Sequence, residues 1–355
     1  MLMNVAIIGL PQSGKKTLFQ LLTGRASFEQ SGRNVGTADI RDPRFDVLVE
    51  RYQPRKQVRA KIDFVLVPTL EKESIAQGDI FNDIVNTDAI CHVVRAFDDA
   101  SVYHAFGSVD PERDITMVNS ELLLHDLLFV EKRLERLAAQ LKKAKDERLH
   151  REQEVLQKMK AHLEVERPLR LLPLSPDEEA LLRSYPFITR KEMILILNVN
   201  DNAVRSEELV SRCSALCASE KIEVMQVSAK LEAEIAALES PAEREEFLKE
   251  LGIKEPALAQ LTRLCLKALG LISFFTVGED EVRQWLVRRG ALAPEAAAVI
   301  HTDLQRGFIR AEVMKYDELI AHYNEAALKA AGKMYLKGKD YTVEDGDILN
   351  IRFKV

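Results

Sequence analysis

The first residues that could do chemistry directly follow a short apolar run near the start of the chain. Residues 9–15 read GLPQSGK, the phosphate-binding pattern G-x-x-x-x-G-K, between a strand-like run (5–8) and a helix-like run (16–23). In this setting backbone N–H groups and the helix N-terminus converge on phosphate, and the Lys15 ammonium reaches the β and γ oxygens. The predicted phosphate-binding residues are Pro11, Gln12, Ser13, Gly14, Lys15, Lys16 and Thr17.

The residue after Lys15 departs from this pattern. A Ser or Thr hydroxyl normally binds Mg²⁺ there, but this chain has Lys16, whose ammonium has no acceptor and cannot coordinate a cation. Thr17 points about 100° further round the helix and is a poor substitute. Lys16 either points into solvent or takes the place of the metal and neutralises phosphate directly. We therefore expect no ordinary magnesium site.

Short apolar and β-branched runs alternate with helix-like stretches along much of the chain. This alternation predicts an α/β fold, with a parallel sheet covered by helices on both faces. At 355 residues the chain is long enough for two or three domains. The strand-like runs are residues 5–8, 61–68, 89–95, 193–198 and 223–227.

Residues 120–185 interrupt the alternation with apolar residues spaced three and four apart. This pattern predicts two antiparallel helices that bury each other's seams, with a turn near Asp146. One helix over residues 120–166 would instead be about 70 Å long. The seam residues are Leu127, Val130, Leu134, Leu137 and Leu141, and then Leu156, Met159 and Leu163.

The last segment, residues 273–355, reads as a small α+β module. Strands are expected at 310–313, 341–343 and 349–353, with a turn at 345–347 and a helix within 316–331.

Composition limits the function classes. A net charge of −6 excludes a general nucleic-acid coat, so contact with RNA would need a local basic patch. No apolar run approaches a bilayer span and the opening residues lack a basic n-region, so a cytoplasmic protein without membrane contact is expected. The four cysteines fit no zinc spacing. Basic residues gather around the expected hairpin tip, either as a solvated surface or as one facing RNA or the ribosome: Lys132, Arg133, Arg136, Lys142, Lys143, Lys145, Arg148 and Arg151.

Several long segments, in order, resemble the YchF family of Obg-related P-loop proteins. They are GLPQSGKKTLFQLLTG, TDAICHVVRAFDD, NVND at 198–201, VSAK at 227–230, LISFFTVGEDEVRQWLVRRG and GKDYTVEDGDILNIRF. The resemblance implies a Ras-like P-loop G domain (1–119 and 186–272), an inserted helical hairpin (120–185) and a C-terminal β-grasp-like TGS domain (273–355). It also implies ribosome association, a preference for ATP and base-site residues Asn198, Asn200, Asp201, Ser228, Ala229 and Lys230.

The chain departs from the family at positions that matter for hydrolysis. LVPT at 66–69 stands where the family has D-x-x-G, so Leu66 replaces a metal-holding Asp and Pro68 removes a backbone donor. Gln30 stands where a switch Thr would join the metal shell. The base box lacks its Lys, with Val199 in that place, and ends in Asp201 where the family usually has Glu. ATP is implied by the family and GTP by Asp201, and both stay open.

The sequence therefore predicts a monomeric regulatory protein that binds a purine nucleotide and acts with the ribosome or a translation partner. Weak or absent hydrolysis is expected, because phosphoryl transfer depends on positioning and charge neutralisation. One alternative is an active ATPase or GTPase that uses unconventional residues, among which His92 reads better as a core residue of its strand. The other is an interaction scaffold that binds no nucleotide. Residues proposed for the unconventional enzyme are His92, His301, Glu71 and Lys72.

Overall fold

The computed structural model describes residues 3–25, 27, 34–70, 79–104, 106–143, 146–203, 207–253, 255–322 and 324–354. It divides into two compact units. Unit 1 comprises Met1–Thr37 and Asp63–Leu258, and unit 2 comprises Ala38–Ile62 and Ala259–Val355. These two units differ in number and bounds from the three domains expected from the sequence, and that three-domain division stays a prediction.

Unit 1 is built on a six-stranded sheet whose strands are mostly the predicted ones. Its members are β1 (Asn4–Ile8), β2 (Asn34–Asp39), β4 (Lys61–Leu66), β5 (Ala89–Arg95), β6 (Glu192–Asn198) and β7 (Glu223–Val227). They lie in the order β2-β4-β1-β5-β6-β7. β1 pairs in parallel with β4 and β5, and β6 pairs in parallel with β5 and β7. The α/β prediction is confirmed, and the carboxyl ends of these parallel strands meet at one edge, where ligands usually bind.

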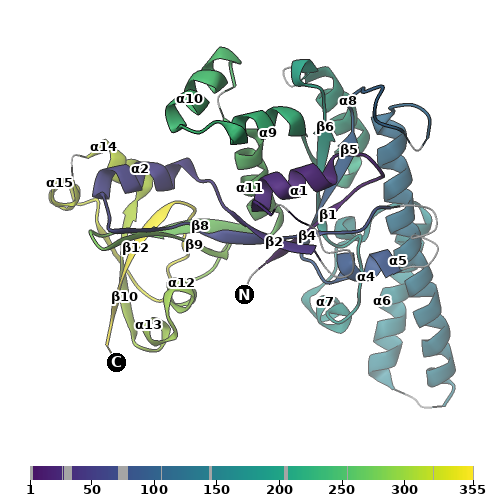
Figure 1. Cartoon of the computed structure of the whole chain (residues 1–355). Coiled ribbons are helices and arrows are strands. Elements are labelled where there is room, and N and C mark those ends of the chain that lie inside the picture. Colours follow the sequence, from purple (N-terminus) through teal and green to yellow (C-terminus); the bar gives the residue numbers. More distant parts are fainter. Residues whose placement is uncertain are drawn as a thin grey trace. The chain divides into compact units, whose positions relative to one another are not determined.

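Helices cover both faces of this sheet (Figure 1). On one face lie α1 (Lys15–Thr23) and α9 (Ala229–Ala237). On the other, α4 (Asp79–Val85), α5 (Pro111–Leu141) and α8 (Glu207–Cys217) bury a core that includes Ile84, Ile115, Val118 and Cys213. The unit also contains α10 (Pro241–Glu250) and the short 3-10 helices η1 (Leu169–Leu171), η2 (Asp201–Ala203) and η3 (Ala218–Glu220). It ends at Leu258, so all but the first two residues of α11 (Ala257–Ala268) belong to unit 2.

The helical hairpin is formed by α5 and α6 (Glu147–Glu164), with α7 (Pro176–Leu182) packed near by (Figure 1). Asp146 caps α6 by accepting from the Arg148 N–H at 2.8 Å. The two antiparallel helices and the turn near Asp146 are thus confirmed, although α5 begins at Pro111, earlier than residue 120. The buried seam includes Val130, Leu137, Leu156, Met159 and Leu163.

A buried carboxylate ties the hairpin to the sheet. Asp126 of α5 accepts from the Ile188 N–H at 3.0 Å, from the Thr189 N–H at 2.7 Å and from the Thr189 hydroxyl at 2.7 Å. Thr189 lies shortly before β6. Since Asp126 is fully buried, these bonds replace its hydration and fix where α5 lies against the strand.

Unit 2 contains a second six-stranded sheet, in the order β11-β10-β12-β8-β9-β3. β10 is antiparallel to β11 and β12, β8 is antiparallel to β9, and β12 runs parallel to β8. The strands are β3 (Lys56–Val58), β8 (Leu271–Thr276), β9 (Glu281–Arg288), β10 (Phe308–Lys315), β11 (Tyr335–Lys337) and β12 (Asp347–Phe353). The helices are α2 (Pro43–Tyr52), α12 (Ala293–Ile300), α13 (Thr302–Arg306), α14 (Tyr316–Ala321) and α15 (Glu325–Ala330).

Two predictions for this segment need correction. The strand expected at 341–343 is a single bridge from Thr342 to Leu292, because the backbone there bonds to the start of α12 rather than to a neighbouring strand. The helix expected within 316–331 is two helices, since Asn324 caps a new one by accepting from the Ala327 N–H at 2.8 Å. The strands at 310–313 and 349–353 are confirmed within β10 and β12.

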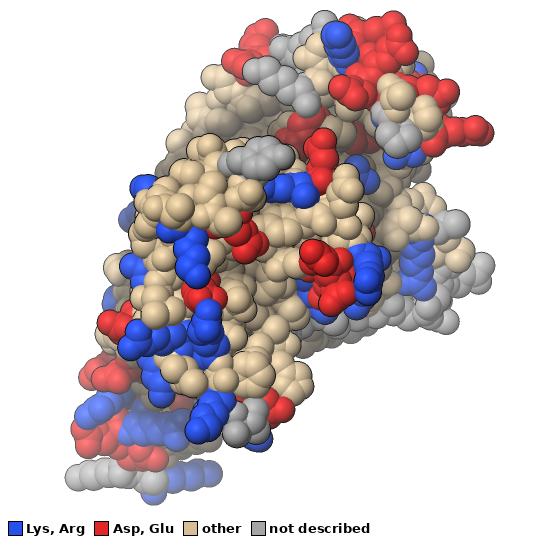
Figure 2. Space-filling view, turned by 90° about the vertical axis from the view of Figure 1, so that its left-hand side faces the viewer, with Lys and Arg blue, Asp and Glu red and all other residues tan. Residues whose placement is uncertain are grey.

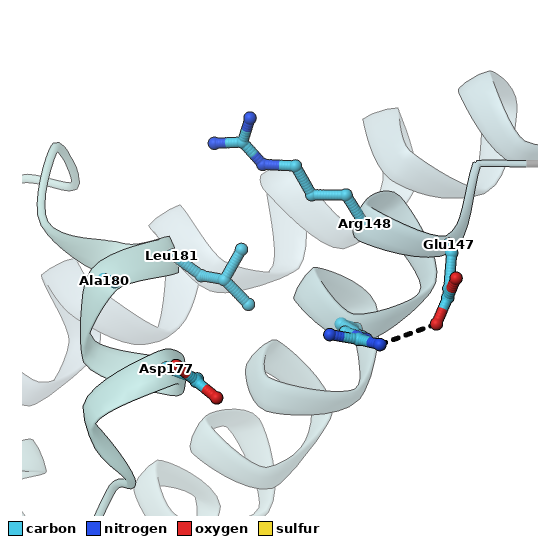
Figure 3. Close-up of a pocket in the computed structure, with 6 residues that line it drawn as sticks. Glu147, Arg148, Asp177, Ala180 and Leu181 are labelled. Carbon is cyan, nitrogen blue, oxygen red and sulfur yellow. Dashed lines mark hydrogen bonds and ion pairs between the residues drawn. The ribbon is translucent and has the colours of Figure 1, made fainter.

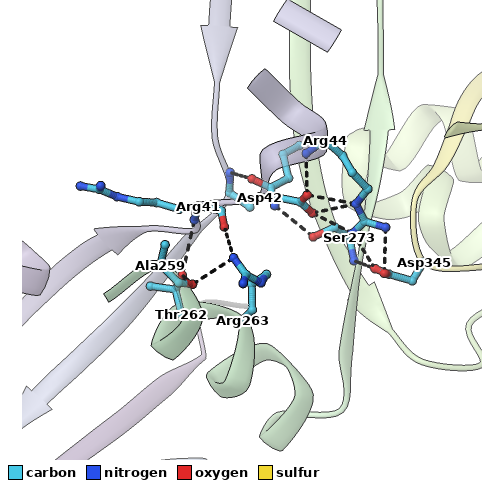
Figure 4. Close-up of polar contacts among 10 residues, drawn as sticks. Arg41, Asp42, Arg44, Ala259, Thr262, Arg263, Ser273 and Asp345 are labelled. Carbon is cyan, nitrogen blue, oxygen red and sulfur yellow. Dashed lines mark hydrogen bonds and ion pairs between the residues drawn. The ribbon is translucent and has the colours of Figure 1, made fainter. Parts of the chain in front are cut away.

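The segment between β2 and β4 is part of unit 2. β3 pairs in parallel with β9, and α2 buries Phe45 and Leu48 against Phe275 and Met314. Figure 4 shows how the start of the segment is held: Arg44 donates to Asp42 at 2.7 Å and to Asp345 at 2.9 Å.

The backbone just before α2 is held as well. The Arg41 N–H donates to the Thr262 hydroxyl, and the Arg263 guanidinium donates to the Arg41 carbonyl, both at 3.4 Å (Figure 4). Within the described ranges, every helix is too short or too polar to cross a bilayer.

Candidate nucleotide site

The turn between β1 and α1 has the backbone that a phosphate loop needs. Gly9 cannot carry a side chain, because a Cβ there would lie 2.5 Å from the Val93 carbonyl oxygen. Gly14 has φ 90°, and a Cβ would lie 2.2 Å from the Asn198 amide nitrogen. Gln12 also has positive φ, 57°. The two glycines therefore let the loop approach β5 and β6 closely, at the carboxyl ends of their strands.

The loop lysine points to the segment that follows β4. Lys15 is 4% exposed, and its ammonium donates to the Thr69 hydroxyl at 2.9 Å. Ser13 is buried too, and its hydroxyl has no hydrogen-bond partner among the described residues. Lys16 and Thr17 are exposed, as is Gln12.

Asn198, the last residue of β6, forms hydrogen bonds to two loops. Its amide nitrogen donates to the Ser13 carbonyl at 3.0 Å, and its amide oxygen accepts from the Ala229 N–H at 3.0 Å. The side chain is 5% exposed. The contact of Asn198 with the base stays a prediction. In the structure both ends of its amide bond to backbone, so the side chain joins the phosphate loop to the turn before α9.

A pocket of about 290 Å³ opens beside this tie. It brings together eight of the thirteen residues predicted from the sequence and adds three others. The lining residues are Gly14, Thr17, Asn198, Asn200, Asp201, Ser228, Ala229 and Lys230, with Phe97, Asp99 and Val199 in addition. Pro11, Gln12, Ser13, Lys15 and Lys16 do not line it; they belong to the phosphate loop next to it.

The polar side of the pocket is held by Asp201. Its carboxylate accepts from the Ser228 hydroxyl at 2.5 Å and pairs with the Lys230 ammonium at 3.2 Å. The hydrogen bond to Asp201 raises the pKa of Lys230, which keeps its charge beside the pocket. The Asn200 side chain instead bonds to the backbone of Asp98. Its amide oxygen accepts from the Asp98 N–H at 3.0 Å, and its amide nitrogen donates to the Asp98 carbonyl at 3.2 Å. It therefore holds the loop after β5.

That loop contributes residues which the sequence analysis did not single out. Arg95, buried at the end of β5, donates to the carbonyls of Phe97, Asp99, Val102 and Tyr103. Its guanidinium carbon lies 4.6 Å from the centre of the Phe97 ring. The sequence did contain a signal for this loop, an arginine at the end of an apolar strand. A buried guanidinium needs several acceptors close by, and the residues that follow the strand can supply them. Hydrogen bonds from Ser101 lower the pKa of Asp99.

The residues at the usual metal positions do not fit a magnesium ion. Lys16 has no acceptor for a cation, and Leu66, at the end of β4, is apolar and 6% exposed. Among the described residues, no group of three or more His, Cys, Asp or Glu could hold a metal. Gln30, Glu71 and Lys72 lie outside the described residues.

The two histidines considered for catalysis lie elsewhere. His92 is fully buried in β5 with neither ring nitrogen hydrogen-bonded among the described residues, and burial lowers its pKa to about 3. It is a neutral core residue, as its strand context indicated. His301 belongs to unit 2, where it caps α13 by accepting from the Asp303 N–H at 3.2 Å.

Comparison with known proteins identifies the family to which this chain belongs. A curated protein of Bacillus subtilis (strain 168), "Ribosome-binding ATPase YchF", is 39% identical over 369 residues that cover 100% of both chains. The chain belongs to the YchF family. A protein of Oryza sativa subsp. japonica, "Obg-like ATPase 1", is 33% identical and matches 99% of this chain and 92% of its own. Residues 271–354 match the family model YchF-GTPase_C, described as a protein of unknown function (DUF933).

A solved YchF structure has the same fold. The YchF GTPase of Schizosaccharomyces pombe aligns with a TM-score of 0.84 at 31% identity, covering 99% of this chain and 97% of that one. A GTP-binding protein of Pyrococcus horikoshii OT3 aligns with a TM-score of 0.59 at 20% identity, covering 99% of this chain and 100% of that one, and so shares the fold. The YchF fold, with its P-loop G domain, helical insertion and C-terminal β unit, is thus established for this chain.

Proposed function

We propose that this YchF-family protein binds a purine nucleotide, hydrolyses it weakly or not at all, and acts with the ribosome. The observation that best supports nucleotide binding is the pair of hydrogen bonds made by the Asn198 amide. One side chain joins the phosphate loop at Ser13 to the pocket wall at Ala229, so phosphate and base would lie at a fixed separation. A pocket of about 290 Å³ has the capacity for a purine.

The Phe97 ring and the Asp201 carboxylate give this pocket the chemistry for a base. An aromatic wall stacks on any purine face, so Phe97 contributes affinity without choosing between bases. Asp201 would choose guanine if its carboxylate accepted from the base, but it already accepts from Ser228 and pairs with Lys230. We therefore propose ATP ahead of GTP, which agrees with the name of the Bacillus subtilis relative.

Weak hydrolysis is proposed from the chemistry at two positions. Lys16 and Leu66 offer no oxygen to a metal ion, and a metal that bridges the phosphates ordinarily neutralises the charge that develops during phosphoryl transfer. The phosphate-binding amides and Lys15 do not depend on those ligands. Binding without efficient turnover is the expected consequence.

The test is a titration panel of ATP, ADP, GTP and GDP, with and without EDTA. Nucleotide should bind in EDTA, and Lys15→Ala should weaken that binding by at least about tenfold, since a charged hydrogen bond is lost. Lys16→Ala distinguishes the two alternatives for that side chain. Nucleotide affinity should fall if Lys16 contacts phosphate and should not change if it points into solvent. A strict need for Mg²⁺, or turnover far above background that Lys15→Ala abolishes, would support an active enzyme instead.

We propose the ribosome as partner because basic side chains gather at the end of the hairpin. Lys132, Arg136, Lys142, Lys143 and Arg148 are exposed there. Close to them a groove of about 620 Å³ lies between α6 and α7, where Arg151 pairs with Glu147 at 2.6 Å (Figure 3). Charge is also unevenly spread elsewhere: on the face that Figure 2 draws, which is the left-hand side of the view in Figure 1 and not the hairpin side, Lys and Arg gather in the lower part. A net acidic protein can therefore carry a local RNA-binding surface.

Ribosome binding is tested with a charge reversal that the fold tolerates. Arg148→Glu places an acidic residue in the first turn of α6, which suits the helix dipole. It should weaken co-sedimentation with ribosomes and reduce the salt dependence of binding by about one unit of slope. Lys249→Glu, an exposed position on α10, is the matched control and should change neither. Equal effects of both variants would refute a hairpin contact.

The remaining elements of the proposal concern organisation. We propose that residues 273–355 form a TGS domain, that residues 1–119 with 186–272 form the G domain around the 120–185 hairpin, and that the protein acts as a cytoplasmic monomer. The family-model match over 271–354 supports the first of these. Light scattering at working concentration tests the last.

A further inference from the structure

Thr69 stands at the phosphate end of the candidate site, in a segment that is held firmly on both sides. The Val67 N–H donates to the Ile7 carbonyl at 3.1 Å, and the Leu70 N–H donates to the Gly9 carbonyl at 3.4 Å. Both side chains are buried, Val67 at 0% and Leu70 at 4% exposure. The backbone that carries Thr69 therefore runs beside the end of β1 and the first residue of the phosphate loop.

The Thr69 hydroxyl engages the ammonium that a nucleotide would use. It accepts a hydrogen bond from Lys15 at 2.9 Å. In a phosphate loop of this pattern, the lysine reaches the oxygens of the β and γ phosphates. The Thr69 hydroxyl therefore accepts the hydrogen bond from Lys15 that an oxygen of the terminal phosphate would otherwise accept.

Thr69 also adds bulk at this place. The side chain is half-buried and carries a methyl group as well as the hydroxyl. Because the hydroxyl contacts the Lys15 ammonium, the Thr69 side chain occupies space directly next to it.

We propose that Thr69 is a specificity-determining residue which makes this site favour a nucleoside diphosphate over the corresponding triphosphate. The inference rests on the proposed nucleotide binding and narrows it to the number of phosphates. A γ phosphate must displace the Thr69 hydroxyl from Lys15 and find room beside its methyl group. A β phosphate also approaches Lys15, but the loop amides hold it as well, so the cost of displacing the hydroxyl falls mainly on the triphosphate.

A purely structural role for the hydroxyl is a distinct alternative with a different consequence. The segment is already anchored by the backbone bonds of Val67 and Leu70, so the hydroxyl is not needed to hold it. If the hydroxyl only stabilised the fold, its removal would lower the unfolding midpoint and leave the ratio of diphosphate to triphosphate affinity unchanged.

The experiment measures dissociation constants of the full chain for ADP, a non-hydrolysable ATP analogue and AMP, in EDTA. The wild-type protein should bind ADP more tightly than the ATP analogue. Thr69→Gly removes both bulk and hydroxyl and should shift the affinity ratio about tenfold towards the triphosphate, the equivalent of one charged hydrogen bond. Thr69→Val keeps the bulk and should shift it less, and Thr69→Ser keeps the hydroxyl and should stay near wild type.

AMP provides the internal control, because Thr69 does not line the base pocket and AMP affinity should be equal in all four proteins. A ratio identical in wild type and Thr69→Gly overturns the proposal, even if nucleotide binding persists. Tighter triphosphate binding by the wild type, lost in Thr69→Val, overturns it as well and makes the hydroxyl a γ-phosphate ligand. Absence of any nucleotide binding by the wild type removes the proposed function together with this inference.

Discussion

Phe45 lies on α2, in the N-terminal part of the sequence, but its ring is 1% exposed in the core of unit 2. The Arg59 guanidinium carbon lies 4.6 Å from the centre of the ring, and Phe275 and Ile348 belong to the same apolar cluster. Replacing Phe45 with Ala should therefore destabilise a sheet built mainly from residues beyond 258.

The expected size follows from burial. Truncating a fully buried Phe to Ala costs about 3–5 kcal/mol, through lost transfer free energy and the cavity left behind. Unit 2 has 25 residues in 38–62 and 97 in 259–355, or 122 in all. For a unit of this size, the loss should lower its melting temperature by roughly 10–20 °C.

The assay uses the single tryptophan of the chain, Trp285. It lies on β9, where its indole N–H donates to the Thr276 hydroxyl at 3.0 Å, so its fluorescence reports unfolding of unit 2. Val47→Ala is the matched control on the same helix, because Val47 is 38% exposed and should shift the midpoint little. If Phe45→Ala leaves the Trp285 transition where Val47→Ala leaves it, α2 is not part of that core.

Three further predictions follow from buried polar groups. Asn198→Ala should lower the unfolding free energy by about 2–4 kcal/mol, because it leaves the Ser13 carbonyl and the Ala229 N–H unpaired, and nucleotide affinity measured by calorimetry should fall with it. Asp126→Ala should cost about 3 kcal/mol or more in urea unfolding, since it removes three hydrogen bonds to a carboxylate. The pKa of His92 is about 3 when folded and near 6.5 when unfolded, so the unfolded chain binds the extra proton between these values. Stability should then fall as pH drops below 6.5, by at most about 1.4 kcal/mol per pH unit, and His92→Leu should remove that component from urea titrations at pH 7 and pH 5.

The sequence predicted those parts of the fold that depend on local pattern. The strands of unit 1 appear as apolar runs because buried parallel strands are apolar on both faces, and the hairpin appears as leucines spaced three and four apart. The phosphate loop was predictable because Gly9 and Gly14 meet a spatial requirement that no other residue fulfils. At residues 341–343 the pattern was wrong, since a three-residue run does not say what its backbone will bond to.

The site was less predictable, because its geometry depends on side chains that meet from distant parts of the chain. Asn198 was predicted as a base-contacting residue, which stays a prediction, but its bonds to Ser13 and Ala229 were not foreseen, because no local pattern reveals partners 185 and 31 residues away. Phe97 was within a recognised segment but was not singled out. Its place in the pocket depends on the loop that Arg95 and Asn200 hold.

The sequence analysis missed most at residues 38–62, because the local pattern there does not reveal which sheet the segment joins. Phe45 and Leu48 are spaced as on an amphipathic helix, but the spacing does not say which sheet they cover. β3 has three residues and pairs with β9, more than two hundred residues away. Residues 271–354, which match the family model, are thus not the whole of the C-terminal sheet: they lack an edge strand and the helix that covers Phe275 and Met314. Since β2 and β4, on either side of this segment, are strands of the other sheet, the chain leaves the sheet of unit 1 after β2, contributes α2 and β3 to unit 2, and returns in β4.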